Sequence, residues 1–133
     1  MAELRMRSPM RSPLGRAIGL GSAKEGVDHW WWQRISSIAL VPLSLWFVIS
    51  VIGLAGADLE TVVLWLDNPV AAVLFVLLIV ATFYHGALGL QVVIEDYVEN
   101  EGAKFAALIV MKLAAFLLAA LGIFSMLKLA FVV

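Results

Sequence analysis

Long apolar stretches separated by short polar segments dominate the chain. Charged side chains are absent or nearly absent from three stretches of 20, 26 and 29 residues, at 35–54, 69–94 and 105–133. About 20 apolar residues in a helix cross a bilayer core. None of the stretches shows the period-2 alternation of a membrane β-barrel strand. The pattern therefore predicts three transmembrane helices, at about 30–55, 69–95 and 104–131.

The amino-acid composition is that of an integral membrane protein. Of 133 residues, 63% are hydrophobic and 14% are charged, and the mean hydropathy is +1.01. Soluble domains average about 45–50% apolar and about 25% charged residues, so a soluble monomer is excluded. The chain has no cysteine, which excludes a disulfide scaffold and a cysteine-held iron–sulfur cluster. The expected fold class is all-α, an integral membrane protein built as a thin three-helix bundle.

The positive charges predict how the chain is oriented. Six of the nine Lys and Arg residues precede the first span or lie at its start, whereas the connection at 55–68 carries only acidic charges. The positive-inside rule then places the N-terminus in the cytoplasm. We expect residues 1–26 to form a basic cytoplasmic arm and residues 27–133 to form the membrane domain. The arm has no apolar core of a secretory signal. A bacterial inner membrane is expected, and a mitochondrial one is the alternative.

His85 is the most informative residue in the apolar stretches. It lies about ten residues before the cytoplasmic end of the second span. This places His85 about 15 Å below that end along the helix. Ionisable residues inside a membrane are rare and usually functional, and imidazole is a common axial ligand of haem iron. The small residues Gly86, Ala87 and Gly89 leave room for a flat porphyrin. The alternative is a structural histidine that is hydrogen-bonded to a neighbouring helix.

The histidine count predicts a partner. The second histidine, His29, precedes the first span and lies about 15 Å above His85 along the membrane normal. It therefore cannot bind the same iron as His85. A second axial ligand must be a different residue type or must come from another polypeptide.

Polar residues gather at the cytoplasmic ends of the first two spans. Asp96 follows His85 by three helical turns and lies near the same face. Next to it, Tyr97 can donate a hydrogen bond to a carbonyl. At the first span, Arg34 can pair with haem propionates or polarise a quinone oxygen. The alternatives are a solvated interface for Asp96 and Tyr97 and a snorkelling anchor for Arg34.

Two other classes of protein fit these features. Three helices, an intramembrane histidine and interfacial acids also suit a small proton-relaying transporter or channel subunit. A purely structural assembly subunit would carry His85 as a packed, inert side chain. The absorption band of a bound haem would distinguish the haem-binding class from both.

One run of residues resembles a known family. The segment from His85 to Val98 reads H-x-x-x-G-x-x-x-V-x-x-D-Y-V. It resembles the signature of the small hydrophobic membrane-anchor subunits of succinate dehydrogenase, respiratory complex II. The segment from Gly26 to Arg34 resembles the entry to the first helix of the same family. The resemblance covers roughly residues 22–105.

The resemblance implies roles for individual residues. His85 matches the axial ligand of haem b, whose other ligand is a histidine of the larger of the two anchor subunits in such a complex. Tyr97 matches the tyrosine that hydrogen-bonds ubiquinone, and Asp96 matches an acid on the proton path. Arg34 and His29 match positions near the haem propionates and the quinone pocket.

The resemblance also implies a division of labour. The whole complex is a succinate:ubiquinone oxidoreductase, in which a flavoprotein subunit oxidises succinate and an iron–sulfur subunit carries the electrons onward. This chain would anchor those subunits together with the larger anchor, in contact with membrane lipid, and would not be catalytic alone. No nucleic acid is expected as a partner.

Overall fold

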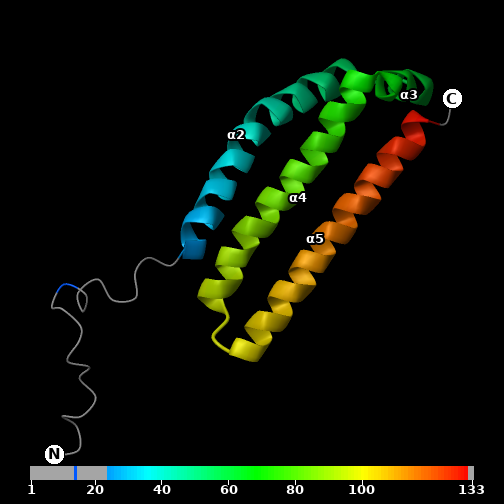
Figure 1. The fold of residues 1–133 in the computed structure, drawn as a ribbon. Coiled ribbons are helices and arrows are strands. Elements are labelled where there is room, and N and C mark those ends of the chain that lie inside the picture. The colour runs from blue at the N-terminus through cyan, green and yellow to red at the C-terminus, as the bar shows by residue number, and fades with distance from the viewer. Residues whose placement is uncertain (1–13, 15–23, 132–133) are drawn as a thin grey trace, which may run out of the picture.

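A computed structural model describes Leu14 and residues 24–131 of the chain. Those residues contain four helices, coloured along the chain in Figure 1: α2 (Lys24–Gly53), α3 (Leu59–Asp67), α4 (Pro69–Tyr97) and α5 (Glu101–Ala130). Three of them are long and apolar enough to cross a membrane, over Gly26–Gly53, Pro69–Tyr97 and Glu101–Ala130. The all-helical class is therefore confirmed, and the three long apolar helices fit the expected spans by length and composition. Most of the predicted basic arm lies outside the described residues.

The first helix begins earlier than the hydrophobic pattern suggested. It starts at Lys24 instead of near residue 30 and ends at Gly53. The turn that follows uses Gly56, whose φ of 81° is favourable only for glycine. Pro42 lies inside α2 and removes one backbone hydrogen-bond donor there. Figure 1 shows α2 as a curved helix.

The connection between the first two spans holds a short helix that the search for long apolar stretches did not predict. It contains α3, whose first turn is capped by Asp58, which accepts a hydrogen bond from the Thr61 backbone N–H at 3.0 Å. Asn68 caps the start of α4 in the same way. One side of α3 is apolar, and its Leu66 is buried in a cluster with Met126 and Ala130 of α5. A short helix forms here because both its cap and its apolar face find partners.

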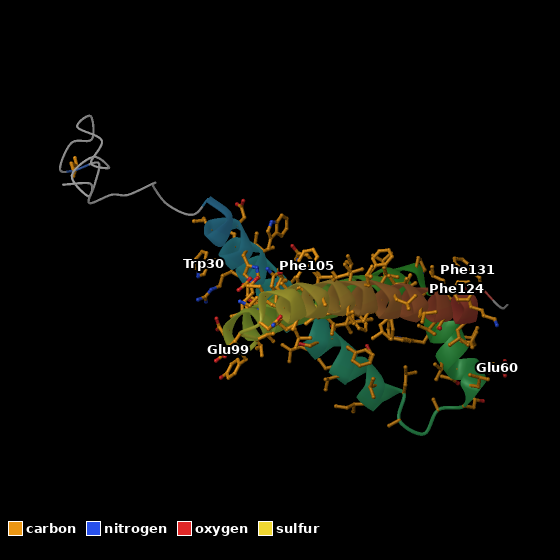
Figure 2. All side chains as sticks on the ribbon, turned by 90° about the horizontal axis from the view of Figure 1, so that it is seen from below. Trp30, Glu60, Glu99, Phe105, Phe124 and Phe131 are labelled. Carbon is orange, nitrogen blue, oxygen red and sulfur yellow. The ribbon has the colours of Figure 1, made fainter. Side chains whose placement is uncertain are left out.

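The long helices lie in a layer instead of a closed bundle. In Figure 1, α4 lies between α2 and α5, and within the described residues it contacts both, whereas α2 and α5 do not contact each other. Gly122 of α5 lies against Ile79 of α4, where a Cβ would come within 3.6 Å of the Ile79 side chain. Figure 2 shows Trp30 and Glu99 at one end of this layer and Glu60 and Phe131 at the other. The thin bundle expected from sequence is therefore corrected to an open layer.

Candidate functional site

A polar strip on α2 faces the middle helix. Ser36 and Gln33 of α2 both come within hydrogen-bonding distance of His85 of α4. His29 precedes Gln33 by one turn, so His29, Gln33 and Ser36 follow the i, i+4, i+7 spacing of one helix face. The prediction that His29 precedes the first span is wrong, because α2 begins at Lys24 and His29 lies inside the apolar span Gly26–Gly53. His29 lies two turns before Ser36, roughly 10 Å along the helix, and is therefore nearer to His85 than expected. Ser36 is only 6% exposed. The structure thus places His85 between two helices, with its ring nitrogens directed toward α2.

The hydrogen bonds around Ser36 assign the tautomer of His85. The Ser36 hydroxyl lies 2.7 Å from the Trp32 carbonyl oxygen and 3.1 Å from that of Gln33. A hydroxyl has a single proton, and donating it to either carbonyl leaves Ser36 Oγ as an acceptor toward His85. His85 Nδ1 lies 2.9 Å from that oxygen, so Nδ1 carries the ring proton. The lone pair of the neutral ring is then on Nε2.

In this chain without partner subunits, the Gln33 amide lies next to the Nε2 lone pair of His85. Its side-chain Nε2 lies 3.4 Å from His85 Nε2, at the long end for a hydrogen bond, with the amide donating. Within residues 24–131, the buried Gln33 Oε1 atom has no hydrogen-bond partner, and neither has Nε2 of His29. Gly89 of α4 lies next to this amide, since a Cβ there would be in ordinary contact with Gln33 Nε2, at 3.8 Å. Unsatisfied buried atoms beside a weakly held ring nitrogen indicate a site that a further group completes.

The donor set fits one side of a haem. Metal-binding histidines usually donate their second ring N–H to a protein acceptor, which fixes the ring and its tautomer, and Ser36 accepts such a bond from His85. A Cβ placed on Gly86 would meet no atom of the described chain within 4 Å, so the surface is open beside the histidine. Among the described residues, no three His, Asp or Glu side chains group as a metal site. Among the described residues, His85 Nε2 is the ring nitrogen that faces α2 beside Gln33, and Gln33 would have to move aside for a metal to reach it.

The other residues singled out from sequence lie apart from His85. Tyr97 is the last residue of α4 and is 82% exposed, and Asp96 beside it is exposed as well. Eleven and twelve residues of helix separate them from His85, roughly 16–18 Å along the axis. Arg34 lies with its guanidinium 5.2 Å from the centre of the Trp30 ring, on the exposed side of α2. The structure brings neither Arg34 nor the Asp96–Tyr97 pair to the histidine.

Gln33 and Ser36 are the site residues that sequence reasoning did not connect with His85. A signal was present, because His29, Gln33 and Ser36 are polar residues at helical spacing along one face. What the spacing does not give is the register of α2 against α4, which decides that this face meets His85.

The fold and the site define a multi-pass membrane protein with a histidine inside one of its apolar helices. Comparison with known families then identifies the group: the chain belongs to the succinate dehydrogenase/fumarate reductase transmembrane subunit family, whose model matches residues 8–119.

Individual relatives agree with this family. A succinate dehydrogenase hydrophobic membrane anchor subunit from Rickettsia bellii is 33% identical over 112 residues, which is 84% of this chain and 90% of that protein. The protein of the same name from Paracoccus denitrificans is 33% identical over 98 residues, covering 74% of this chain and 75% of its own length. A succinate dehydrogenase membrane anchor subunit from Reclinomonas americana is 27% identical over 95 residues, covering 69% of this chain and 79% of its own length. The resemblance read from the H-x-x-x-G to D-Y-V run is thereby confirmed.

Proposed function

We propose that this chain is an anchor subunit of a succinate:ubiquinone oxidoreductase, where it holds the flavoprotein and iron–sulfur subunits at the membrane and contributes to haem b and ubiquinone binding. Family membership and three apolar helices support the anchor role. The observation that carries the haem assignment is the Ser36–His85 hydrogen bond, which leaves the His85 Nε2 lone pair available. The distribution of positive charge supports a cytoplasmic N-terminus, and the Rickettsia and Paracoccus relatives support a bacterial inner membrane.

In this proposal His85 would hold the haem iron through Nε2. The larger anchor of the complex would supply the second ligand, because His29, the only other histidine in the sequence, lies two turns of α2 before Ser36. A haem held there would supply reversible one-electron chemistry. Ser36 holds the imidazole ring and keeps the proton on Nδ1. Gln33 releases Nε2, and its amide is then free to hydrogen-bond elsewhere in the site.

Ubiquinone is proposed to bind at the cytoplasmic end of α4. Reduction to the quinol takes two electrons, delivered from the iron–sulfur subunit, and two protons. The Tyr97 hydroxyl donates a hydrogen bond to a quinone oxygen as negative charge develops there. Asp96 passes protons from the aqueous side. Arg34 contributes positive charge, and His29 contributes a hydrogen-bonding ring nitrogen, from the start of α2. The exposure of Tyr97 supports a site that other subunits complete.

The experiment that tests this function uses His85→Ala in the whole complex. We expect the reduced b-type absorption band to be lost or strongly weakened, because one axial ligand is gone. Succinate oxidation with an artificial electron acceptor should persist, since the flavin lies in another subunit. The matched control is His29→Ala, which removes the only other histidine and should retain a b-type band. A wild-type haem spectrum in His85→Ala would refute the assignment.

A further inference from the structure

A groove between α4 and α5 lies outside the haem and quinone sites described above. It has a volume of about 620 Å³, and its lining is largely apolar. Its polar side chains come from three residues, Tyr84 and Gln91 of α4 and Lys112 of α5, and within the described part of the chain no acidic residue lines it. Sites for small molecules typically have about 300–1,000 Å³ and a few polar groups in an apolar wall, so the groove has the size and character of a ligand site.

Lys112 places a positive charge in this groove, and no described acidic side chain pairs with it. The one ion pair found among the described residues joins Lys104 to Glu101, at 3.1 Å. One acidic side chain, Glu95, lies next to the groove without lining it. It accepts a hydrogen bond of 2.8 Å from the amide of Gln91, which does line the groove. A cation inside a membrane span is costly unless it meets an anion or reaches the interface.

The depth of Lys112 brings its ammonium to the headgroup level. The 30 residues of α5 extend about 45 Å, against about 30 Å of hydrocarbon, so about 7 Å projects on each side when the helix is centred. Lys112 lies eleven residues after Glu101, roughly 16 Å along the helix, and its backbone is then about 9 Å inside the hydrocarbon. A snorkelling lysine side chain spans most of that depth.

The polarity of the groove changes along its length. Gln91 and Lys112 lie toward the joined ends of α4 and α5, whereas Val80 and Ile123 lie toward the opposite ends. A polar part near the joined ends of α4 and α5 and an apolar part toward their other ends match the two parts of a phospholipid. The headgroup would lie at the polar part and an acyl chain along the apolar part. A partner helix in the groove would instead have to bury an acidic side chain opposite Lys112, at a high desolvation cost.

We propose that this groove binds an anionic phospholipid, with the phosphate on Lys112 and an acyl chain between α4 and α5 along Phe116 and Ile123. Basic pockets between transmembrane helices on the cytoplasmic side commonly hold such headgroups. The cytoplasmic leaflet follows from the proposed orientation of the chain. The binding itself does not depend on haem or quinone.

The test is native mass spectrometry of the whole complex, purified from nanodiscs of phosphatidylcholine with or without phosphatidylglycerol. We expect the wild type to retain phosphatidylglycerol on the anchor subunits, and Lys112→Gln to retain about fivefold less. Lys112→Arg keeps the charge and should retain the lipid. The matched control is Lys128→Gln, which removes a lysine of the same helix outside the groove.

Three outcomes would overturn the proposal. The first is wild-type lipid retention by Lys112→Gln. The second is equal retention of phosphatidylcholine and phosphatidylglycerol by the wild type. The third is loss of partner subunits from Lys112→Gln in both lipid compositions, which would assign the groove to a partner helix. If Lys112→Gln assembles poorly, the test rests on Lys112→Arg, which keeps the positive charge. Lys112→Arg must retain as much phosphatidylglycerol as the wild type, and a lower content would contradict the proposal.

Discussion

At the scale of single residues, the hydroxyl of Ser36 controls which nitrogen of His85 is free. We predict that Ser36→Ala weakens haem binding, because the buried Nδ1–H loses its acceptor and the ring proton is free to move to Nε2. Loss of such an outer partner typically costs 10–100-fold in metal affinity. The measurements are the haem-to-flavin ratio of the purified complex and the midpoint potential of the remaining haem.

Two neighbouring variants make the Ser36 prediction specific. Ser36→Thr keeps the hydroxyl and should restore haem content and potential. Ser37→Ala removes a hydroxyl that donates to the Arg34 carbonyl at 2.7 Å, next to Ser36 but without contact to His85, and should behave as wild type. If Ser36→Ala has the haem content and potential of the wild type, the hydrogen bond to Nδ1 has no role in ligation.

Tyr97 offers a second test with a minimal change. We predict that Tyr97→Phe lowers quinone reductase activity roughly tenfold or more, because the ring remains and one donor to the developing oxyanion is lost. The exposed position of Tyr97 means that little packing is disturbed. Haem content and succinate oxidation with an artificial acceptor are the controls. Reduction of ubiquinone at the wild-type rate would show that Tyr97 is only an interfacial aromatic residue.

Sequence reasoning singled out His85 but not its hydrogen-bond partners Ser36 and Gln33, for a physical reason. A histidine inside an apolar stretch stands out because its cost in lipid is high, whatever the neighbouring helix is. Ser36 and Gln33 become partners only through the register of α2 against α4, which depends on packing that no local pattern encodes. Asp96 and Tyr97 stood out through spacing along one helix, and their role depends on chains outside this one.

At the scale of elements, the long helices were predictable because hydrophobic length alone specifies them. The short helix α3 was not predicted because its nine residues are too few to cross a bilayer, and the search was for stretches of about 20 apolar residues. Its signals were nevertheless local: Asp58 three residues before Thr61, an apolar run, and Asn68–Pro69 at the start of the next helix. The early start of α2 was missed because Lys24–Gly26 adds charge and a glycine to the helix.

The cap of α3 predicts a pH-dependent element. The pKa of Asp58 is lowered, first by the hydrogen bond from the Thr61 side chain and then by that from its backbone N–H. A lowered pKa means that the cap stabilises α3 fully above the ordinary carboxyl pKa and is lost as the pH falls through the lowered value. We predict that Asp58→Ala speeds hydrogen exchange in residues 59–67 at neutral pH, whereas Asp58→Asn, which still caps, does not. Equal exchange in all three proteins would mean that packing on α5 alone holds α3.

At the scale of the whole molecule, the open layer leaves most side chains of residues 26–131 exposed on the surface of this chain. Five described residues are buried, namely Leu66, Ala71, Met126, Ala130 and Ser36, and large apolar side chains are exposed along every long helix. Lipid covers such surfaces, but it cannot satisfy the buried His29 and Gln33 atoms that have no hydrogen-bond partner among the described residues. A layer of this kind has two faces on which other membrane helices can pack.

The architecture therefore predicts that this chain alone does not form a haem protein. In the proposed function His85 would supply only one of the two ligands, and its Nε2 lies 3.4 Å from the Gln33 amide nitrogen. Expressed alone in membranes, the chain should be free of haem and degraded quickly. Co-expression with the larger anchor should bring both the b-type band and resistance to proteolysis. Co-expression of His85→Ala with the larger anchor separates haem binding from assembly of the two subunits. A stable complex without haem would show that helix contacts drive assembly. Loss of both haem and the complex would show that haem joins the subunits. A stable, haem-loaded chain in the absence of partners would refute the prediction.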